Sequence, residues 1–425
     1  MQRVFALIRR LWNDSYVRTS AGFFLASMGV AVLNYAFHPI VSRLLSLRDF
    51  GDVQALFSLS TQLTTILGAF TLATVHASVN YHEPGEAEAV VRALRRSALA
   101  IVFVFIVVLV LGAEHFSAAL QFTSSSLFFA LACFLITTVL YSIQTGKLQG
   151  SGRFFQLSLA QSLVAGGRIL FASGLILLGW RAFGAMIGIV LAQVMALGYV
   201  LFMAQRSKTA VPVASFALSR KRFVRELGYV ALVGVSMAYI TALYTVDVLI
   251  VKRLFPPDIA GLYAGISTVA KIIIFSTSPF AAVLLSSIKR QDEPVVRRRV
   301  FLKSLALIGA VGGGAALVFA LVPALVIKTM IGAKYTSQAE LLPWLAFAFV
   351  GVAIANVSFY LGLALKRRRL LFLVAVGSVV LLVSTALSHE TLLDVVKNLT
   401  LTGLVAAGSG LLFAFREIRD RSLYG

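Results

Sequence analysis

The stretch RLLSLRDFG at residues 43–51 separates the first two long apolar runs of this chain, and a related stretch, RLFPPDIAG, occupies residues 253–261. Each runs eight positions from Arg-Leu to Gly and carries an aspartate just ahead of the glycine. Glycine removes side-chain clash at a helix start, and an acid is favourable there. The two copies are 210 residues apart in a chain of 425, so the repeat predicts two related halves.

The composition predicts a membrane protein, because 59% of the residues are hydrophobic and only 13% are charged. A hydrocarbon core about 30 Å thick needs about 20 apolar helical residues, and runs of that length recur throughout. They are continuous, unlike the short alternating segments of an outer-membrane barrel. The sequence therefore predicts an all-α, polytopic membrane protein. The expected spans are 19–42, 50–80, 97–116, 125–146, 154–179, 182–204, 226–252, 259–288, 301–328, 338–365, 369–388 and 393–415, twelve in all.

The basic residues gather on one side of these spans. With a cytoplasmic N-terminus, 28 of the 38 lie in inner segments, including the clusters at 206–225, 289–303 and 366–369. The positive-inside rule then predicts that both termini are cytoplasmic. The net charge of +21 therefore reflects the orientation of the chain in the membrane. Because no groove-reading motif accompanies the basic runs, we expect no nucleic-acid partner.

The polar linker RSKTAVPVASFALSRKRFVRE divides the spans into two sets of six. We expect a cytoplasmic interfacial amphipathic helix at 1–18, an N-lobe at 19–205, a basic linker at 206–225 and a C-lobe at 226–425. Because each lobe holds an even number of spans, the repeat is parallel, and the two bundles should be related by a pseudo-two-fold axis along the membrane normal.

Three stretches resemble the polysaccharide-export flippases of the multidrug/oligosaccharidyl-lipid/polysaccharide (MOP) superfamily. They are RLLSLRDFGDVQALFSL in the first hairpin, GKLQGSGRFFQLSLAQ at 146–161 and TVDVLIVKRLFPPDIAGLYAGISTVAKII at 245–273. With the span count, the resemblance covers nearly the whole chain. It implies a V-shaped fold in the bacterial inner membrane whose helices 1, 2, 7 and 8 line a central cationic cavity.

The function that the resemblance implies is outward translocation of a lipid-linked oligosaccharide, of the undecaprenyl-pyrophosphate type, by alternating access. Partners would be this lipid, the surrounding membrane lipids and other polysaccharide-assembly proteins. The alternatives are a cation/drug antiporter of the same superfamily, which needs carboxylates, and a membrane glycosyltransferase or polymerase, which needs acids or metal ligands on sizeable loops. No metal-ligand or catalytic motif is present, so the sequence predicts no enzyme and no cofactor, with proton or sodium coupling left open.

Lys271 is the sharpest candidate for a binding residue. It lies about twelve residues into the span 259–288, about 18 Å along the helix and near mid-membrane. A lysine there costs about 2.5–3.5 kcal/mol unless it meets water or an acid. Asp247, the one acid in the interior of any predicted span, lies at a similar depth. Lys271 either captures a pyrophosphate or acidic sugar or forms an internal ion pair, and protonation of Asp247 would release it.

Other polar side chains recur on one face of the same predicted helices. They either line the substrate cavity or hold helices together. Arg168, in a span that should not line the centre, either binds a lipid phosphate or holds a neighbouring helix through its backbone carbonyls. The cavity candidates besides Lys271 and Asp247 are Ser27, Asn34, His38, Gln62, Thr65, Arg168, Tyr244, Tyr263 and Ser267.

Overall fold

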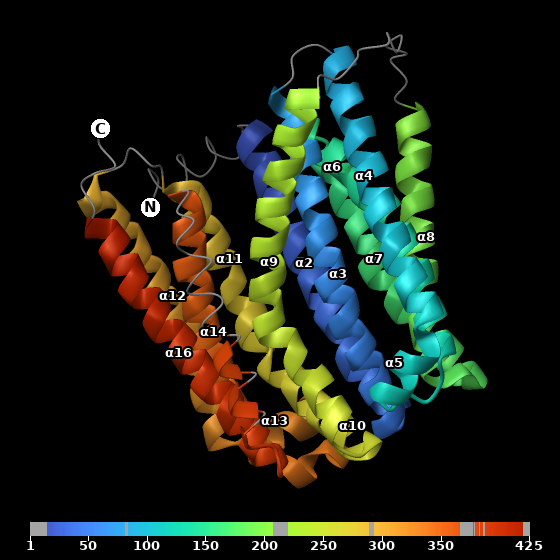
Figure 1. The fold of residues 1–425 in the computed structure, drawn as a ribbon, viewed down its shortest axis with the longest axis vertical. Coiled ribbons are helices and arrows are strands. Elements are labelled where there is room, and N and C mark those ends of the chain that lie inside the picture. The colour runs from blue at the N-terminus through green and yellow to red at the C-terminus, as the bar shows by residue number, and fades with distance from the viewer. Residues whose placement is uncertain are drawn as a thin grey trace, which may run out of the picture. The chain divides into compact units, whose positions relative to one another are not determined.

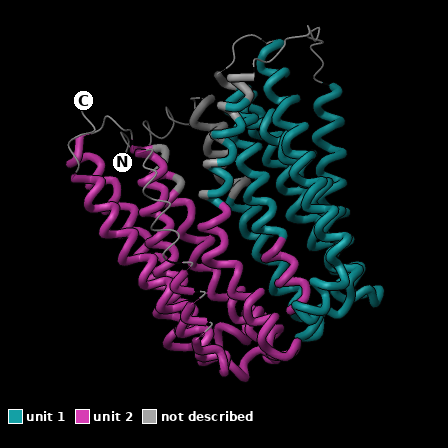
Figure 2. Tube along the Cα trace, viewed as in Figure 1, with its two compact units in different colours: residues 1–49, 60–237 teal, residues 50–59, 238–425 magenta. Residues whose placement is uncertain are grey.

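The structure, a computed structural model, describes residues 15–80, 84–206, 220–288, 293–365, 377, 379–381, 383–385 and 387–419. Throughout these residues the regular structure is helical, without a strand (Figure 1). Two compact units are present, residues 1–49 with 60–237 and residues 50–59 with 238–425 (Figure 2).

The described part of unit 1 contains seven long helices and two short elements. These are α2 (Ser15–Leu44), α3 (Leu47–Asn80), α4 (Pro84–Leu111), α5 (Ala113–Ala119), α6 (Ser126–Gly150), α7 (Phe154–Leu175), the π-turn η1 (Ile176–Trp180), α8 (Arg181–Arg206) and the first part of α9 (Arg220–Leu254). Its core joins Leu67 of α3, Leu94 of α4 and Leu135 of α6.

Unit 2 contains the rest of α9 and further helices among the residues that the structure describes. These are α10 (Pro257–Ala270), α11 (Ile272–Ser287), α12 (Pro294–Leu321), α13 (Pro323–Met330), the 3₁₀ turn η2 (Ala333–Gln338), α14 (Leu341–Ala364) and α16 (Leu392–Arg419). One of its apolar clusters joins Ile240 of α9, Phe359 of α14 and Phe413 of α16. Residues 50–59 of α3 also belong to this unit.

Nine segments of the described residues are long and apolar enough to cross a membrane. One of them, 53 residues long, holds both α7 and α8. Large apolar side chains such as Phe103 and Leu412 are exposed, as expected for helices that face acyl chains. Most of the predicted span 369–388, the amphipathic segment up to residue 14 and linker residues 207–219 lie outside the described residues, so the count of twelve, the topology and the lobe boundaries stay predictions.

Three spans predicted as continuous helices consist of two pieces. The span 97–116 is interrupted at Gly112, and the span 301–328 at Val322. At the second point α13 begins with Pro323, which has no amide hydrogen to continue the preceding helix. The span 259–288 divides into α10 and α11 at Lys271. The backbone of Lys271 stays helical there, and its amide and carbonyl still bond to Ser267 and Phe275 at 2.9 and 3.1 Å.

Because proline has no amide hydrogen, the sequence predicts that Pro279 breaks the span 259–288, and this prediction is wrong. Pro279 lies inside α11, which runs through it from Ile272 to Ser287. Its ring leaves the carbonyl of Phe275 without the usual amide donor. The Ser278 hydroxyl donates to that carbonyl at 3.2 Å, as the serines and threonines beside the proline predict.

Small residues set the closest helix contacts. A Cβ on Gly146 would lie 2.9 Å from the Thr74 Cβ, and one on Gly150 would lie 2.5 Å from the Ser78 Cβ. Two pairs of small residues spaced by four therefore join α6 to α3, which is the small-xxx-small packing of membrane helices. The GKLQG stretch is thus a helix-packing motif in this structure.

The repeated glycines of the two hairpins contact each other. A Cβ on Gly51 would lie 2.8 Å from Gly261 Cα, so α3 and α10 cross backbone to backbone at this point. Gly51 lies within α3, and the glycines of the described chain that have positive φ are at other positions. The role predicted for Gly51, a turn residue at a helix start, is therefore corrected: its lack of a side chain permits a helix crossing.

The predicted helix-starting acids lie where they were expected. Asp49 is in the first turn of α3, and Asp258 is in the first turn of α10. Ser46 donates its hydroxyl to Asp49 Oδ2 at 2.7 Å and accepts the Asp49 amide at 3.1 Å. This reciprocal arrangement is a capping box, and it fixes the point where α3 begins.

Candidate functional site

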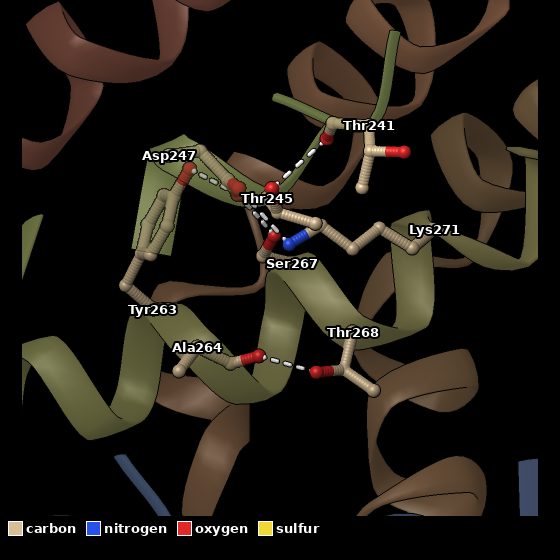
Figure 3. Close-up of polar contacts among 8 residues, drawn as sticks. All are labelled: Thr241, Thr245, Asp247, Tyr263, Ala264, Ser267, Thr268 and Lys271. Carbon is tan, nitrogen blue, oxygen red and sulfur yellow. Dashed lines mark hydrogen bonds and ion pairs between the residues drawn. The ribbon is translucent and has the colours of Figure 1, made fainter. Parts of the chain in front are cut away.

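A buried carboxylate with three donors forms the polar centre of unit 2 (Figure 3). Asp247 projects from α9, and it is 2% exposed. Tyr263 and Ser267, both fully buried on α10, donate their hydroxyls to Asp247 Oδ2 at 3.1 and 2.5 Å. The Lys271 Nζ donates to the other oxygen, Oδ1, at 3.0 Å. We refer to these four residues as the Asp247 cluster.

The spacing of the donors explains the geometry. Tyr263, Ser267 and Lys271 are four residues apart, so they lie along one face of α10 and its junction with α11. That face meets the one carboxylate that α9 carries into the interior of the unit. The four side chains therefore converge because a helical repeat on α10 lies opposite a single acid.

The two charged groups of the cluster differ in how completely they are bonded. Asp247 accepts three hydrogen bonds, on both of its oxygens. Lys271 has three donor hydrogens, and among the described residues Asp247 Oδ1 is its one acceptor. The remaining contact of the ammonium is the Phe349 ring, whose centroid is 5.8 Å from Nζ. The carboxylate is close to saturated, whereas the ammonium keeps donor capacity.

The other predicted residue of unit 2, Tyr244, lies one turn before Asp247 on α9. It is half-buried, and its ring packs edge-on against Phe275 at 6.3 Å between centroids. The hydroxyls of Thr245 and Thr268 bond to carbonyls of their own helices, Thr241 and Ala264. These threonines satisfy the backbone and do not donate to Asp247.

Arg168 of unit 1 makes the contact that the structural alternative predicted. Its guanidinium donates to the backbone carbonyl of Asn34 at 2.5 Å and lies over the Phe37 ring, 4.8 Å from the centroid. Arg168 is 7% exposed on α7, while Asn34 and Phe37 are on α2. The arginine therefore links α7 to α2, and Asn34 takes part in this contact through its backbone carbonyl.

The remaining candidates of unit 1 are spread over α2 and α3. His38 is buried, with its ring edge-on to Phe37 at 5.4 Å. Thr65 donates its hydroxyl to the Thr61 carbonyl of its own helix at 2.7 Å, and Gln62 is half-buried. Ser27 lies in a part of α2 whose side chains are outside the described set. Of the predicted residues, the structure thus joins four into one cluster and two, Arg168 and Asn34, into a second contact.

Solved structures with the same helix arrangement are found among transporters. The chain matches the inward-facing conformation of a multidrug resistance MATE family transporter of the MOP superfamily with a TM-score of 0.76 at 15% identity, over 92% of this chain and 94% of the other. It matches the lipid II flippase MurJ in an inward closed conformation with a TM-score of 0.72 at 13% identity, over 94% of this chain and 87% of the other. This chain has the MATE fold. No family model matches the sequence, and neither does any curated protein.

Within this MATE fold, sequence reasoning missed a second buried ion pair. Lys252 Nζ lies 2.5 Å from Asp52 Oδ1, and the two side chains are 1% and 0% exposed. Both residues were expected near the ends of predicted spans, where charges usually reach water. The pair lies next to the contact between Gly51 and Gly261, and the repeat of that glycine was the one sequence signal that could have located it.

Proposed function

We propose that this protein is a flippase that moves a polyprenyl-pyrophosphate-linked oligosaccharide from the cytoplasmic to the outer leaflet of the bacterial inner membrane. It acts as a transporter by alternating access, not as an enzyme. Support comes from the hairpin stretches that resemble polysaccharide-export flippases and from the MATE fold, which the lipid II flippase MurJ shares. In this proposal the chain has twelve spans, cytoplasmic termini and two lobes at 19–205 and 226–425.

The observation that carries the proposal is the buried ammonium with one acceptor. Lys271 is buried, and it has donor hydrogens that the described residues do not use. A pyrophosphate or an acidic sugar offers several anionic oxygens, and charge-assisted hydrogen bonds to them are about twice as strong as neutral ones. Lys271 is therefore the residue of unit 2 best suited to capture the anionic part of the cargo.

The Asp247 carboxylate supplies a release step. While Asp247 is ionised, it holds Lys271 at 3.0 Å. A proton on Asp247 removes the negative charge, and the attraction that keeps the ammonium in place is then lost. Tyr263 and Ser267 stay hydrogen-bonded to the carboxyl group, so the acid keeps its position while Lys271 turns to the cargo. A proton gradient would drive turnover through this step.

A cation/drug antiporter remains the second candidate, because the match to a multidrug MATE transporter has the higher TM-score. An antiporter would use a carboxylate to bind its cationic substrate. Asp247 already accepts from three donors, including a lysine. This second function predicts that Asp247 is indispensable and that Lys271 is dispensable.

The test reconstitutes the protein into vesicles that carry a fluorescent polyprenyl-pyrophosphate oligosaccharide and measures how much of it a non-permeant reagent reaches over time. We expect Lys271→Gln to lower the initial rate about tenfold or more, and Lys271→Arg to retain part of it. Ser278→Ala, which removes a hydroxyl bonded to its own helix, serves as the matched control on α11. An unchanged rate in Lys271→Gln, or no translocation by the wild-type protein, would contradict the proposal.

The role of Asp247 is tested in the same vesicles. Asp247→Asn keeps the size of the side chain and removes its negative charge. We expect transport by Asp247→Asn to lose its dependence on an imposed pH gradient, whereas the wild type keeps it. If the variant responds to the gradient as the wild type does, Asp247 is not the coupling group.

A further inference from the structure

The exposed side of α12 carries positive charges at one end of the helix. Arg298, Arg299 and Lys303 are exposed, and the ion pairs among the described residues involve other side chains. Arg299 and Lys303 are four positions apart, so they lie on one face of the helix, and Arg298 is about 100° away around it. In the proposed topology this end of α12 lies at the cytoplasmic side of the membrane.

The face that holds Arg299 and Lys303 continues into the membrane span as a strip of small residues. Ala306, Ala310 and Gly314 follow at helical spacing, and all three are exposed. A Cβ on Gly314 would meet nothing within 4 Å. At 1.5 Å per residue the strip is about 12 Å long. The helix backbone is therefore accessible along a line that begins at two positive charges.

The helix of unit 1 with a comparable basic end, α4, lacks such a strip. Arg95 and Arg96 are exposed near the start of this span, but large side chains follow them. Phe103 is 66% exposed and Val104 is 58% exposed. A basic end is what the positive-inside rule requires of both helices. The small residues of α12 are not explained by that rule, and α4 supplies a matched comparison.

The charges of α12 favour one kind of occupant. A pyrophosphate diester carries two negative charges, and Arg299 and Lys303 supply two positive ones. The arginine fork binds phosphate oxygens in pairs, and the lysine acts as a point charge. The phosphodiester of an ordinary anionic phospholipid carries only one negative charge, so it leaves one of the two cations unmatched.

A second copy of the chain fits this face less well than a lipid does. A two-fold axis along the membrane normal would bring Arg299 and Lys303 of both copies to the same depth, where like charges repel. A hydrocarbon chain has no charge to bring to the strip. It can lie close to the backbone of α12 and gain dispersion contacts there, because alanine and glycine do not hold it away.

We propose that Arg299, Lys303 and the strip at 306–314 form a docking site for a polyprenyl-pyrophosphate lipid in the cytoplasmic leaflet. The pyrophosphate binds the two basic side chains, and the prenyl chain lies along the strip. The site is distinct from the Asp247 cluster and holds the lipid before translocation. The identity of this lipid rests on the proposed function, but its binding to α12 is measured without transport.

The first experiment maps where the lipid binds. The probe is a polyprenyl pyrophosphate without sugar that carries a photoreactive diazirine near its head group, added to the protein in phosphatidylcholine nanodiscs. We expect labelled peptides from residues 302–314, and about tenfold less labelling in Arg299→Gln/Lys303→Gln, because each basic residue near the membrane surface adds to the attraction. Arg95→Gln/Arg96→Gln, which also removes two charges, should label as the wild type does. Equal labelling of all three proteins would overturn the proposal.

Competition identifies the source of the phosphate chemistry. Unlabelled polyprenyl pyrophosphate should abolish the labelling of α12, whereas an equal mole fraction of phosphatidylglycerol should leave most of it. Full competition by phosphatidylglycerol would show a surface for any anionic lipid, and full competition by inorganic pyrophosphate at the same concentration would show that the strip has no part in binding. Either result would overturn the proposal.

The second experiment measures the rate of translocation against the mole fraction of lipid-linked oligosaccharide. In Arg299→Gln/Lys303→Gln the mole fraction that gives the half-maximal rate should rise about tenfold while the maximal rate is unchanged, because docking precedes the translocation step. Ala310→Phe, which fills the strip without a change of charge, should act in the same direction. Val104→Phe, at an exposed large residue of α4, is its control. A lower maximal rate at an unchanged half-maximal mole fraction would overturn the docking role.

The competing occupant has its own test. Ala310→Cys in a Cys133→Ser background carries one cysteine, which lies in the strip. Oxidation of this variant in nanodiscs that contain two copies should leave it monomeric on a non-reducing gel. Disulfide-linked dimers would show that a second copy covers the strip and would reject the lipid.

These readouts separate the inference from the proposed function. Labelling of α12 by polyprenyl pyrophosphate in a protein that moves no oligosaccharide would keep the docking site and reject the flippase. Translocation by a wild type whose α12 is not labelled would keep the flippase and reject the docking site.

Discussion

Unit 2 contains two buried aspartate–lysine pairs that differ in nearly everything except their charges. Asp52 and Lys252 are 2.5 Å apart, with side chains 0% and 1% exposed, next to a crossing of two glycines. Asp247 and Lys271 are 3.0 Å apart, and the lysine side chain is 9% exposed at the junction of α10 and α11. The first pair is enclosed by tight packing, whereas the second is surrounded by hydroxyls and an aromatic ring.

The difference indicates which pair can change during a transport cycle. Separating Asp52 from Lys252 would leave each of two fully buried charges without its counter-ion, and the close crossing of α3 and α10 restricts rearrangement. Separating Asp247 from Lys271 leaves the carboxylate with two donors. We therefore assign the first pair to stability and the second to function.

The largest loss of stability is expected when the Asp52–Lys252 pair is disrupted. Lys252→Ala should destabilise the protein by about 3–5 kcal/mol, because it removes the counter-ion of a fully buried carboxylate. Lys271→Ala should lose less, since the Lys271 side chain is less completely buried and Asp247 keeps the donors Tyr263 and Ser267. Thermal unfolding of both variants measures the difference. A lower stability of Lys271→Ala than of Lys252→Ala would contradict this assignment. The double variant Asp52→Asn/Lys252→Met, which removes both charges, is the control for Lys252→Ala.

A smaller effect is expected at the glycine crossing beside that pair. Gly51→Ala places a Cβ 2.8 Å from Gly261 Cα and should cost about 1–3 kcal/mol, because backbone atoms must move. Gly68→Ala is the matched control on the same helix, since nothing lies within 4 Å of its Cβ position. It should be neutral or stabilising by up to about 1 kcal/mol. Equal thermal stability of the two variants would show that the crossing tolerates a side chain.

The smallest effect on stability is expected at a half-exposed lysine–glutamate pair of unit 1. Lys147 lies 2.9 Å from Glu88, but the two side chains are 36% and 42% exposed. Water screens such a pair, so Lys147→Ala should lower stability by only about 0.2–1 kcal/mol. Tm values of Lys147→Ala and Lys252→Ala under identical conditions test whether burial sets the order. A loss at Lys147 as large as that at Lys252 would reject burial as the explanation.

The spacing of polar residues was sufficient to predict much of the candidate site. Tyr263, Ser267 and Lys271 recur every four residues, and Asp247 is the one acid in the interior of a predicted span. Sequence reasoning could not place the helix break, because Pro279 was the visible helix breaker and the interruption lies at Lys271. Nor could it decide that Arg168 binds a carbonyl of α2, since that contact joins residues 134 positions apart.

The sequence by itself determined the helices and the membrane environment, because a bilayer forces each apolar run to satisfy its own backbone and this requirement is local. The sequence also contains the repeat of Arg-Leu and Gly, which predicts that the two hairpins are related. Only the tertiary structure decided that Gly51 meets Gly261 and that Asp52 is neutralised by Lys252, 200 residues away. A charged side chain near the end of a span is exposed to water unless another helix covers it. Which helix covers it depends on packing between segments that are distant in the sequence.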